Sequence, residues 1–259
     1  MTNNNPIGLF DSGIGGTSIW KEINELLPNE NTIYLADSKN APYGQKSKDE
    51  IIALSIKNTE FLLNMNCKII VVACNTATTN AIKELRAKYD VPFIGIEPAI
   101  KPAALKSETH TIGILATKGT LSSDLFHQTA EKFHETKIIE QIGFGLVPLI
   151  ENGDINSKEM NDLLKTYLNP MIEANIDYLV LGCSHYPYLI PQIKKILPKN
   201  IKIIDSGEAV ARQTKNILQE KNKLKLDDKL GEVIFYTNSN PKVLQSILNG
   251  NYTILQKKF

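Results

Sequence analysis

The chain has 259 residues, 42% of them apolar and 22% charged, which suits one large or two small α/β domains. Its formal net charge of +1 gives no electrostatic reason to expect binding to nucleic acid or to an acidic membrane surface. The N-terminal residues lack a secretory signal pattern, and no apolar run approaches the roughly 18 residues that cross a bilayer. Three cysteines without C-x₂-C spacing predict free thiols, a cytoplasmic location and no metal site.

The first predicted strand, Ile7 to Phe10, runs into a glycine-rich loop that enters a helix ending near Leu27. The loop, Asp11-Ser-Gly-Ile-Gly-Gly-Thr17, has neither the G-x-G-x-x-G spacing of dinucleotide sites nor a Walker lysine. Its backbone N–H groups would suit a small carboxylate, although a tight turn that merely needs glycine explains the same residues. The carboxylate of Asp11, at a strand end, should point into a cleft.

The second predicted strand, Thr32 to Ala36, leads into a polar loop that contains Tyr43 and Gly44. Loops at this edge of a sheet often carry function, although most of them only connect elements. An amphipathic helix should follow, from about Ser47 to Met65.

A third strand, Ile69 to Ala73, has five apolar residues in a row and ends at Cys74-Asn75-Thr76, before a helix that extends to Tyr89. Open α/β sheets bind ligands at the carboxyl ends of their strands, and a helix start lowers a thiol's pKa. Cys74 is therefore a candidate functional thiol, although most free cysteines are simply small buried residues. Cys67, at the opposite end of this strand, is expected to be structural.

The remaining predicted elements alternate strand and helix. They are strands at 93–96, 112–116, 137–141, 178–181 and 201–205, helices at 100–105, 121–133, 157–174, 187–197 and 208–220, a loop that contains Glu151, and a β-α-β tail at 233–237, 241–248 and 252–255. A unit as small as this tail cannot bury its own apolar face, so we expect it to dock on the first half of the chain.

A second segment repeats the design of the Cys74 strand. Asp177-Tyr-Leu-Val-Leu-Gly-Cys-Ser-His-Tyr-Pro187 places Cys183 at a strand end, 109 residues after Cys74, and other segments repeat at a similar spacing. We therefore predict two similar doubly wound α/β domains that face each other across a cleft. The first would comprise residues 1–97 and 209–259, including the returning tail, and the second residues 98–208.

Two thiols on opposite sides of one tetrahedral carbon suit an inversion in which one sulfur removes a proton and the other delivers one. Each thiol needs a neighbour that accepts its proton or stabilises its charge, because few thiols are ionised at neutral pH. Asp11 is the candidate beside Cys74, and His185 and Glu151 are the candidates beside Cys183, although His185 would also suit a packed turn. A Cys-His hydrolase would leave the second cysteine unexplained, and a redox pair usually shows C-x-x-C.

Five ordered motifs, spread from about Ile7 to Val210, resemble the aspartate/glutamate racemase family. They are Asp11-Ser-Gly-Ile-Gly-Gly16, Tyr34-Leu-Ala-Asp37 with Pro42-Tyr-Gly44, Ala73-Cys-Asn-Thr-Ala77, Gly95-Ile-Glu-Pro-Ala99 and Gly182-Cys-Ser-His-Tyr-Pro187. The resemblance implies an isomerase without a cofactor that interconverts L- and D-glutamate and supplies D-glutamate for peptidoglycan. It also implies two α/β domains and a homodimer. Racemisation of aspartate, or non-catalytic binding of a small acid, are the alternatives.

By the same resemblance, Cys74 and Cys183 would be the acid/base pair, supported by Asp11, Glu151 and His185. The substrate, glutamate, would be held by four pairs of neighbours: Asp11 and Ser12, Tyr43 and Gly44, Asn75 and Thr76, and Ser184 and His185. The chain departs from the family pattern at Ser184, where threonine is usual; a hydroxyl is kept, so its hydrogen bond should survive with a looser rotamer.

Overall fold

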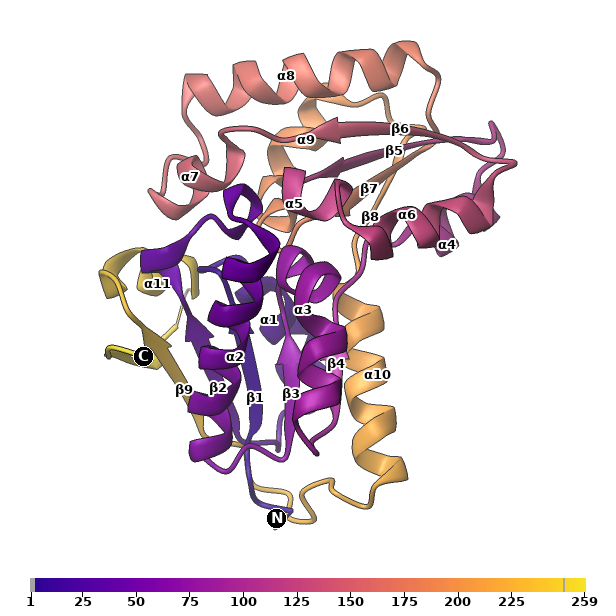
Figure 1. Cartoon of the computed structure of the whole chain (residues 1–259). Helices are drawn as coiled ribbons and strands as arrows, with labels where there is room; N and C mark the ends of the chain where they lie inside the picture. The colour runs from indigo at the N-terminus through magenta and orange to yellow at the C-terminus, as the bar shows by residue number, and fades with distance from the viewer. Residues whose placement is uncertain (1–2, 249) are drawn as a thin grey trace.

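The computed structural model describes residues 3–248 and 250–259, which form two parallel β-sheets with helices packed around them. Strand order is β10-β9-β2-β1-β3-β4 in one sheet and β6-β5-β7-β8 in the other. Figure 1 shows the four-stranded sheet above the carboxyl-end edge of the six-stranded sheet. This arrangement confirms the predicted α/β class with two facing sheets. Within the described residues, no helix has the length and apolar character needed to cross a membrane.

The six-stranded sheet is built from both ends of the chain. Its strands are β1 (Ile7–Asp11), β2 (Thr32–Ala36), β3 (Ile69–Val72), β4 (Phe93–Gly95), β9 (Val233–Thr237) and β10 (Thr253–Gln256). The three central strands β1, β2 and β3 are fully buried, as their continuous apolar runs predict. β9 pairs in parallel with β2, so the tail docks on the first half of the chain as expected.

Helices cover both faces of this sheet (Figure 1). They are α1 (Thr17–Leu26), α2 (Lys48–Asn64), α3 (Asn75–Lys88), α10 (Gly207–Glu220) and α11 (Pro241–Leu248), with short 3₁₀ turns η1 (Ser38–Asn40) and η2 (Tyr43–Gln45). α2 starts at a capping box in which Ser47 and Glu50 each satisfy the other's backbone N–H. Helix α10 packs against α1, on the six-stranded sheet.

The four-stranded sheet is built from one continuous part of the chain. Its strands are β5 (Thr111–Ala116), β6 (Lys137–Ile142), β7 (Tyr178–Gly182) and β8 (Lys202–Ile204). The accompanying helices are α4 (Ile100–Lys106), α5 (Lys118–Leu121), α6 (Asp124–Ala130), η3 (Glu131–Phe133), α7 (Leu146–Glu151), α8 (Lys158–Glu173), η4 (Tyr186–Leu189) and α9 (Ile190–Ile196).

Two local predictions are wrong in this half. The expected helix at 121–133 is broken between α5 and α6, because the hydroxyl of Ser123 accepts the Phe126 N–H and starts a new helix there. Glu151 was expected in a loop but ends helix α7, whose preceding residue is the left-handed Gly145.

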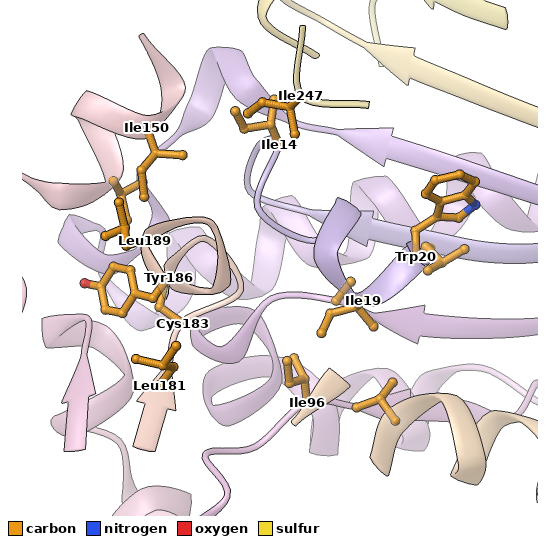
Figure 2. Packing of buried hydrophobic residues seen from close by; sticks show 14 of the residues in the cluster. Ile14, Ile19, Trp20, Ile96, Ile150, Leu181, Cys183, Tyr186, Leu189 and Ile247 are labelled. Atoms are coloured by element: carbon orange, nitrogen blue, oxygen red, sulfur yellow. The ribbon is translucent and has the colours of Figure 1, made fainter. Parts of the chain in front are cut away.

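A single apolar cluster joins the two halves. It includes Ile14 and Trp20 beside the first sheet and Leu181 and Leu189 from the second. Figure 2 shows Cys183 within this cluster, beside Tyr186. The strands of each sheet lie within the domains proposed from the sequence, but the boundaries at residues 97 and 208 themselves stay predictions.

Candidate active site

The carboxyl ends of strands from both sheets meet around one small cavity. β1 ends at Asp11, Cys74 follows the end of β3, and Cys183 follows β7. Nine residues selected from the sequence line the cavity: Ser12, Tyr43, Gly44, Cys74, Asn75, Thr76, Cys183, Ser184 and His185. The other two, Asp11 and Glu151, lie behind it and hydrogen-bond to Ser184 and His185 respectively. The two sulfurs thus share one pocket, while the role of each residue stays a prediction.

Cys74 is the N-cap of helix α3. Its Sγ accepts the N–H of Ala77 at 3.4 Å and lies 3.8 Å from the hydroxyl of Ser12. Burial, and then the negative charge of Asp11, raise the pKa of the Cys74 thiol well above its ordinary value, against the opposing effect of the Ala77 N–H. In the closed protein Cys74 is therefore a protonated thiol.

Asp11 is fully buried and connects the two halves of the site. One oxygen accepts the N–H groups of Gly13 and Gly16, at 3.2 and 3.0 Å, and the other accepts the hydroxyl of Ser184 at 3.2 Å. Burial raises the pKa of the Asp11 carboxyl, although the charge of His185 and the Gly16 N–H oppose that rise. A carboxylate with a raised pKa is a better proton acceptor at neutral pH.

Cys183, His185 and Glu151 form a chain of contacts on the other side. His185 Nδ1 lies 3.8 Å from Cys183 Sγ, and its Nε2 lies 2.6 Å from Glu151 Oε1. Burial alone would lower the pKa of His185, but hydrogen bonds to Cys183 and Glu151, with the charge of Asp11, raise it well above its ordinary value.

The raised pKa of His185 favours the doubly protonated ring. An imidazolium carries a proton on each nitrogen, so Nε2 donates to Glu151 and Nδ1 faces the sulfur of Cys183 as a donor. The N–H of Gly15 also points at Nε2, at 3.2 Å. An imidazolium in this position places its positive charge beside the Cys183 sulfur.

The glycine-rich loop is not a free carboxylate-binding loop, contrary to that expectation. Its N–H groups at Gly13 and Gly16 bind Asp11, and that of Ile14 binds Glu151 at 2.7 Å. The loop therefore holds two of the protein's own carboxylates beside the two thiols. A Cβ at Gly13 would lie 1.9 Å from Glu151 Oε1, so any side chain here would displace the Glu151 carboxylate.

Tyr43 is held in the cavity wall by buried partners. Its hydroxyl donates to Asp37 and accepts from Asn58 Nδ2 at 3.1 Å. Asp37 also accepts from the amide of Asn238, which lies just beyond strand β9. The tail thereby fixes one wall of the site.

The comparisons with known proteins agree with this geometry. The family model for Asp/Glu/hydantoin racemases matches residues 7–214. The chain belongs to this racemase family. The matched region contains both cysteines and every side chain described around them except Asn238.

Curated relatives and solved structures match most of the chain or nearly all of it. A glutamate racemase of Ralstonia pickettii is 48% identical over 208 residues, which are 80% of this chain and 74% of that protein. The crystal structure of a Bacillus anthracis glutamate racemase isoform has a TM-score of 0.89 at 30% identity and covers 99% of this chain and 98% of its own. Escherichia coli glutamate racemase, solved with L-glutamate and an activator, has a TM-score of 0.86 at 33% identity, covering 97% and 98%.

Three residues that line this racemase site were not selected as site residues from the sequence, namely Pro42, which was quoted only as part of a motif, Thr117 and Val147. The internal repeat contained a signal for one of them, because Ile112–Lys118 resembles Ile7–Gly13 at an offset that places Thr117 on Ser12. The Thr117 hydroxyl lies 2.8 Å from that of Thr76.

The site is closed in this structure. The cavity volume is about 10 Å³, about the space that one water molecule needs. Hydrogen bonds join the two halves around it: Asn80 Nδ2 donates to the carbonyl of Gly119 at 2.9 Å, and Ser18 Oγ donates to that of Ser184 at 2.8 Å. A cavity of this volume has no room for a molecule of several heavy atoms.

Proposed function

We propose that this racemase interconverts L- and D-glutamate by proton transfer between Cα of the substrate and the thiols of Cys74 and Cys183. The observation that carries the proposal is the shared pocket of two cysteines that come from different sheets, each with its own charged neighbours. The relatives named glutamate racemase, 40–48% identical over most of the chain, support glutamate rather than aspartate as the substrate.

The reaction would start with Cys183 as thiolate, stabilised by the His185 imidazolium, and Cys74 as thiol. The thiolate removes the Cα proton from one face, and Cys74 delivers its proton to the opposite face. The other enantiomer needs the reverse pairing, in which Asp11 takes the proton of Cys74 and the His185 imidazolium gives a proton to the Cys183 thiolate. Each direction conserves protons, and neither needs a redox change.

The substrate carboxylate would bind at the start of helix α3. The N–H groups of Asn75 and Thr76 open this helix and have no intrahelical acceptor, and the helix dipole favours an anion there. Both polar atoms of the Asn75 side chain are buried with no hydrogen-bond partner among the described residues, and they line the cavity. A buried unpaired amide is costly, so its natural partner is the substrate.

Entry would require the proposed units, residues 98–208 against 1–97 with 209–259, to move apart and then close again. Closure expels water and strengthens every electrostatic contact around Cα. Ser12, Tyr43-Gly44 and Ser184, on the cavity wall, would complete the binding of the substrate.

The decisive test is incubation with L-glutamate in deuterated water without added cofactor, followed by chiral separation and mass analysis. D-glutamate should carry deuterium at Cα from the first turnovers, while recovered L-glutamate stays largely protonated, because each face has its own base. Equal early labelling of both enantiomers would point to a single shared base. No labelling, or faster labelling of aspartate in a parallel assay, would refute the proposal.

Replacing Asn75 with alanine should separate stability from activity. The change removes two unsatisfied polar atoms, so the free energy of unfolding should be unchanged or rise by about 1 kcal/mol, while KM for glutamate rises about tenfold. Chemical denaturation and racemisation kinetics measure the two effects. A loss of stability with unchanged KM would show that Asn75 serves the fold alone.

The wider role rests on the same proposal. The enzyme would work in the cytoplasm, where D-glutamate supplies peptidoglycan synthesis. It would act as a homodimer, which sedimentation equilibrium can test directly.

A further inference from the structure

A second small cavity adjoins the site just described. Its volume is about 30 Å³, and it shares Pro42, Gly44, Thr117 and Val147 with the cavity of the two cysteines. The two spaces therefore meet along one wall. Substrate approaching the thiols from this side would pass through the second cavity, which we call the vestibule.

Cationic side chains are scarce around the two cavities. His185 is the only cationic group lining the cysteine cavity among the described residues, and its charge is matched by Glu151 at 2.6 Å and by the nearby Asp11. Two carboxyl groups therefore surround one imidazole, and the cavity lining offers no further cation. Glutamate carries a net negative charge, so the side chains around the thiols supply no excess positive charge to attract it.

Lys118 supplies a positive charge next to this cavity. It lines the vestibule as the first residue of helix α5, directly after the shared Thr117. Its side chain is exposed, and no carboxylate lies within 4.0 Å of it among the residues that the structure describes. It is the only cationic residue in the described lining of the vestibule.

We propose that Lys118 captures the anionic substrate at the vestibule and so sets KM, without taking part in proton transfer. This inference rests on the proposed function and adds a residue that no motif singled out. An ammonium on a flexible stem suits the role, since it can hold a carboxylate in the open protein and release it as the cavity closes. A charge at an entrance acts on association, which salt screens.

The test compares Lys118→Gln and Lys118→Arg with the parent enzyme in both directions of glutamate racemisation. Lys118→Gln should raise KM about threefold to tenfold and leave kcat within about twofold, because the charge is lost at the entrance only. Lys118→Arg should restore the parent KM. The difference should shrink in about 1 M salt, where the Debye length falls to about 3 Å.

The matched control is Lys165→Gln, which removes an exposed lysine from α8, far along the sequence and outside both cavities. An unchanged KM in Lys118→Gln, an equal change in Lys165→Gln, or a loss of kcat alone would overturn the inference while the parent still racemises glutamate. A parent enzyme with no activity on glutamate would refute the proposed function, and this inference with it.

Discussion

Replacing Cys74 or Cys183 with alanine is expected to lower kcat/KM for glutamate racemisation by roughly 10²–10⁴ or more, because each sulfur serves one face of Cα. The loss must be equal in the two directions, since the enantiomers have the same free energy in solution. Chiral assay of both reactions measures it. The Cys→Ser variants should be similarly inactive, because a hydroxyl ionises far less readily than a thiol, and they retain an N-cap oxygen at position 74.

Cys67 provides the matched control. It is as buried as the other two cysteines but lies at the opposite end of β3, where burial raises its pKa to about 12. Cys67→Ala should lower the free energy of unfolding by about 1 kcal/mol and leave kcat unchanged. If Cys74→Ala or Cys183→Ala racemised glutamate at the parent rate, the two-thiol mechanism would be wrong and the site would be a binding site only.

Replacing His185 with glutamine should reduce kcat about 10²-fold or more, because Cys183 loses the cation that stabilises its thiolate. The same variant should change how stability depends on pH. The pKa of His185 is raised above its ordinary value of 6.5 in the folded protein, so the folded state binds a proton more tightly than the unfolded state does.

The stabilising contribution of His185 is fully present below about pH 6.5 and is lost as the pH rises through the raised folded pKa. One proton gives a slope of at most about 1.4 kcal/mol per pH unit. Urea denaturation between pH 6 and 9 should show this decline in the parent and a flatter profile in His185→Gln.

His127→Gln is the matched control, because His127 is exposed on α6. It should leave both activity and the pH profile as they are in the parent. A parent profile that stays flat across this range would mean that His185 is neutral in the folded protein, and the charge assignment of the site would then be wrong.

Strand ends explain why so much of the site could be predicted. A continuous apolar run such as Ile69–Val72 marks a buried parallel strand, and parallel strands align their carboxyl ends. Cys74, Cys183 and Asp11 each follow or end such a run, so their meeting at one edge was predictable once the chain was seen as two halves. The docking of the tail followed from its small size.

What could not be predicted depends on contacts between distant residues. The N–H of Ile14 in the glycine loop binds the carboxylate of Glu151, which lies 137 residues later in the chain. The break between α5 and α6 depends on the hydroxyl of Ser123, which a periodic pattern does not reveal. Lys118 belongs to none of the sequence motifs. The role proposed for it depends on the absence of any other cationic side chain from the described lining of the vestibule.

The pairing of β9 with β2 affects the order in which the two sheets can fold during synthesis. All four strands of the smaller sheet are complete once residue 204 has been made, so that half can form while synthesis continues. The larger sheet cannot be completed until residues 233–256 have been synthesised, and until then one edge of β2 lacks its partner strand β9. Since Asn238 also secures Asp37 beneath Tyr43, catalytic competence would be the last property that a nascent chain acquires.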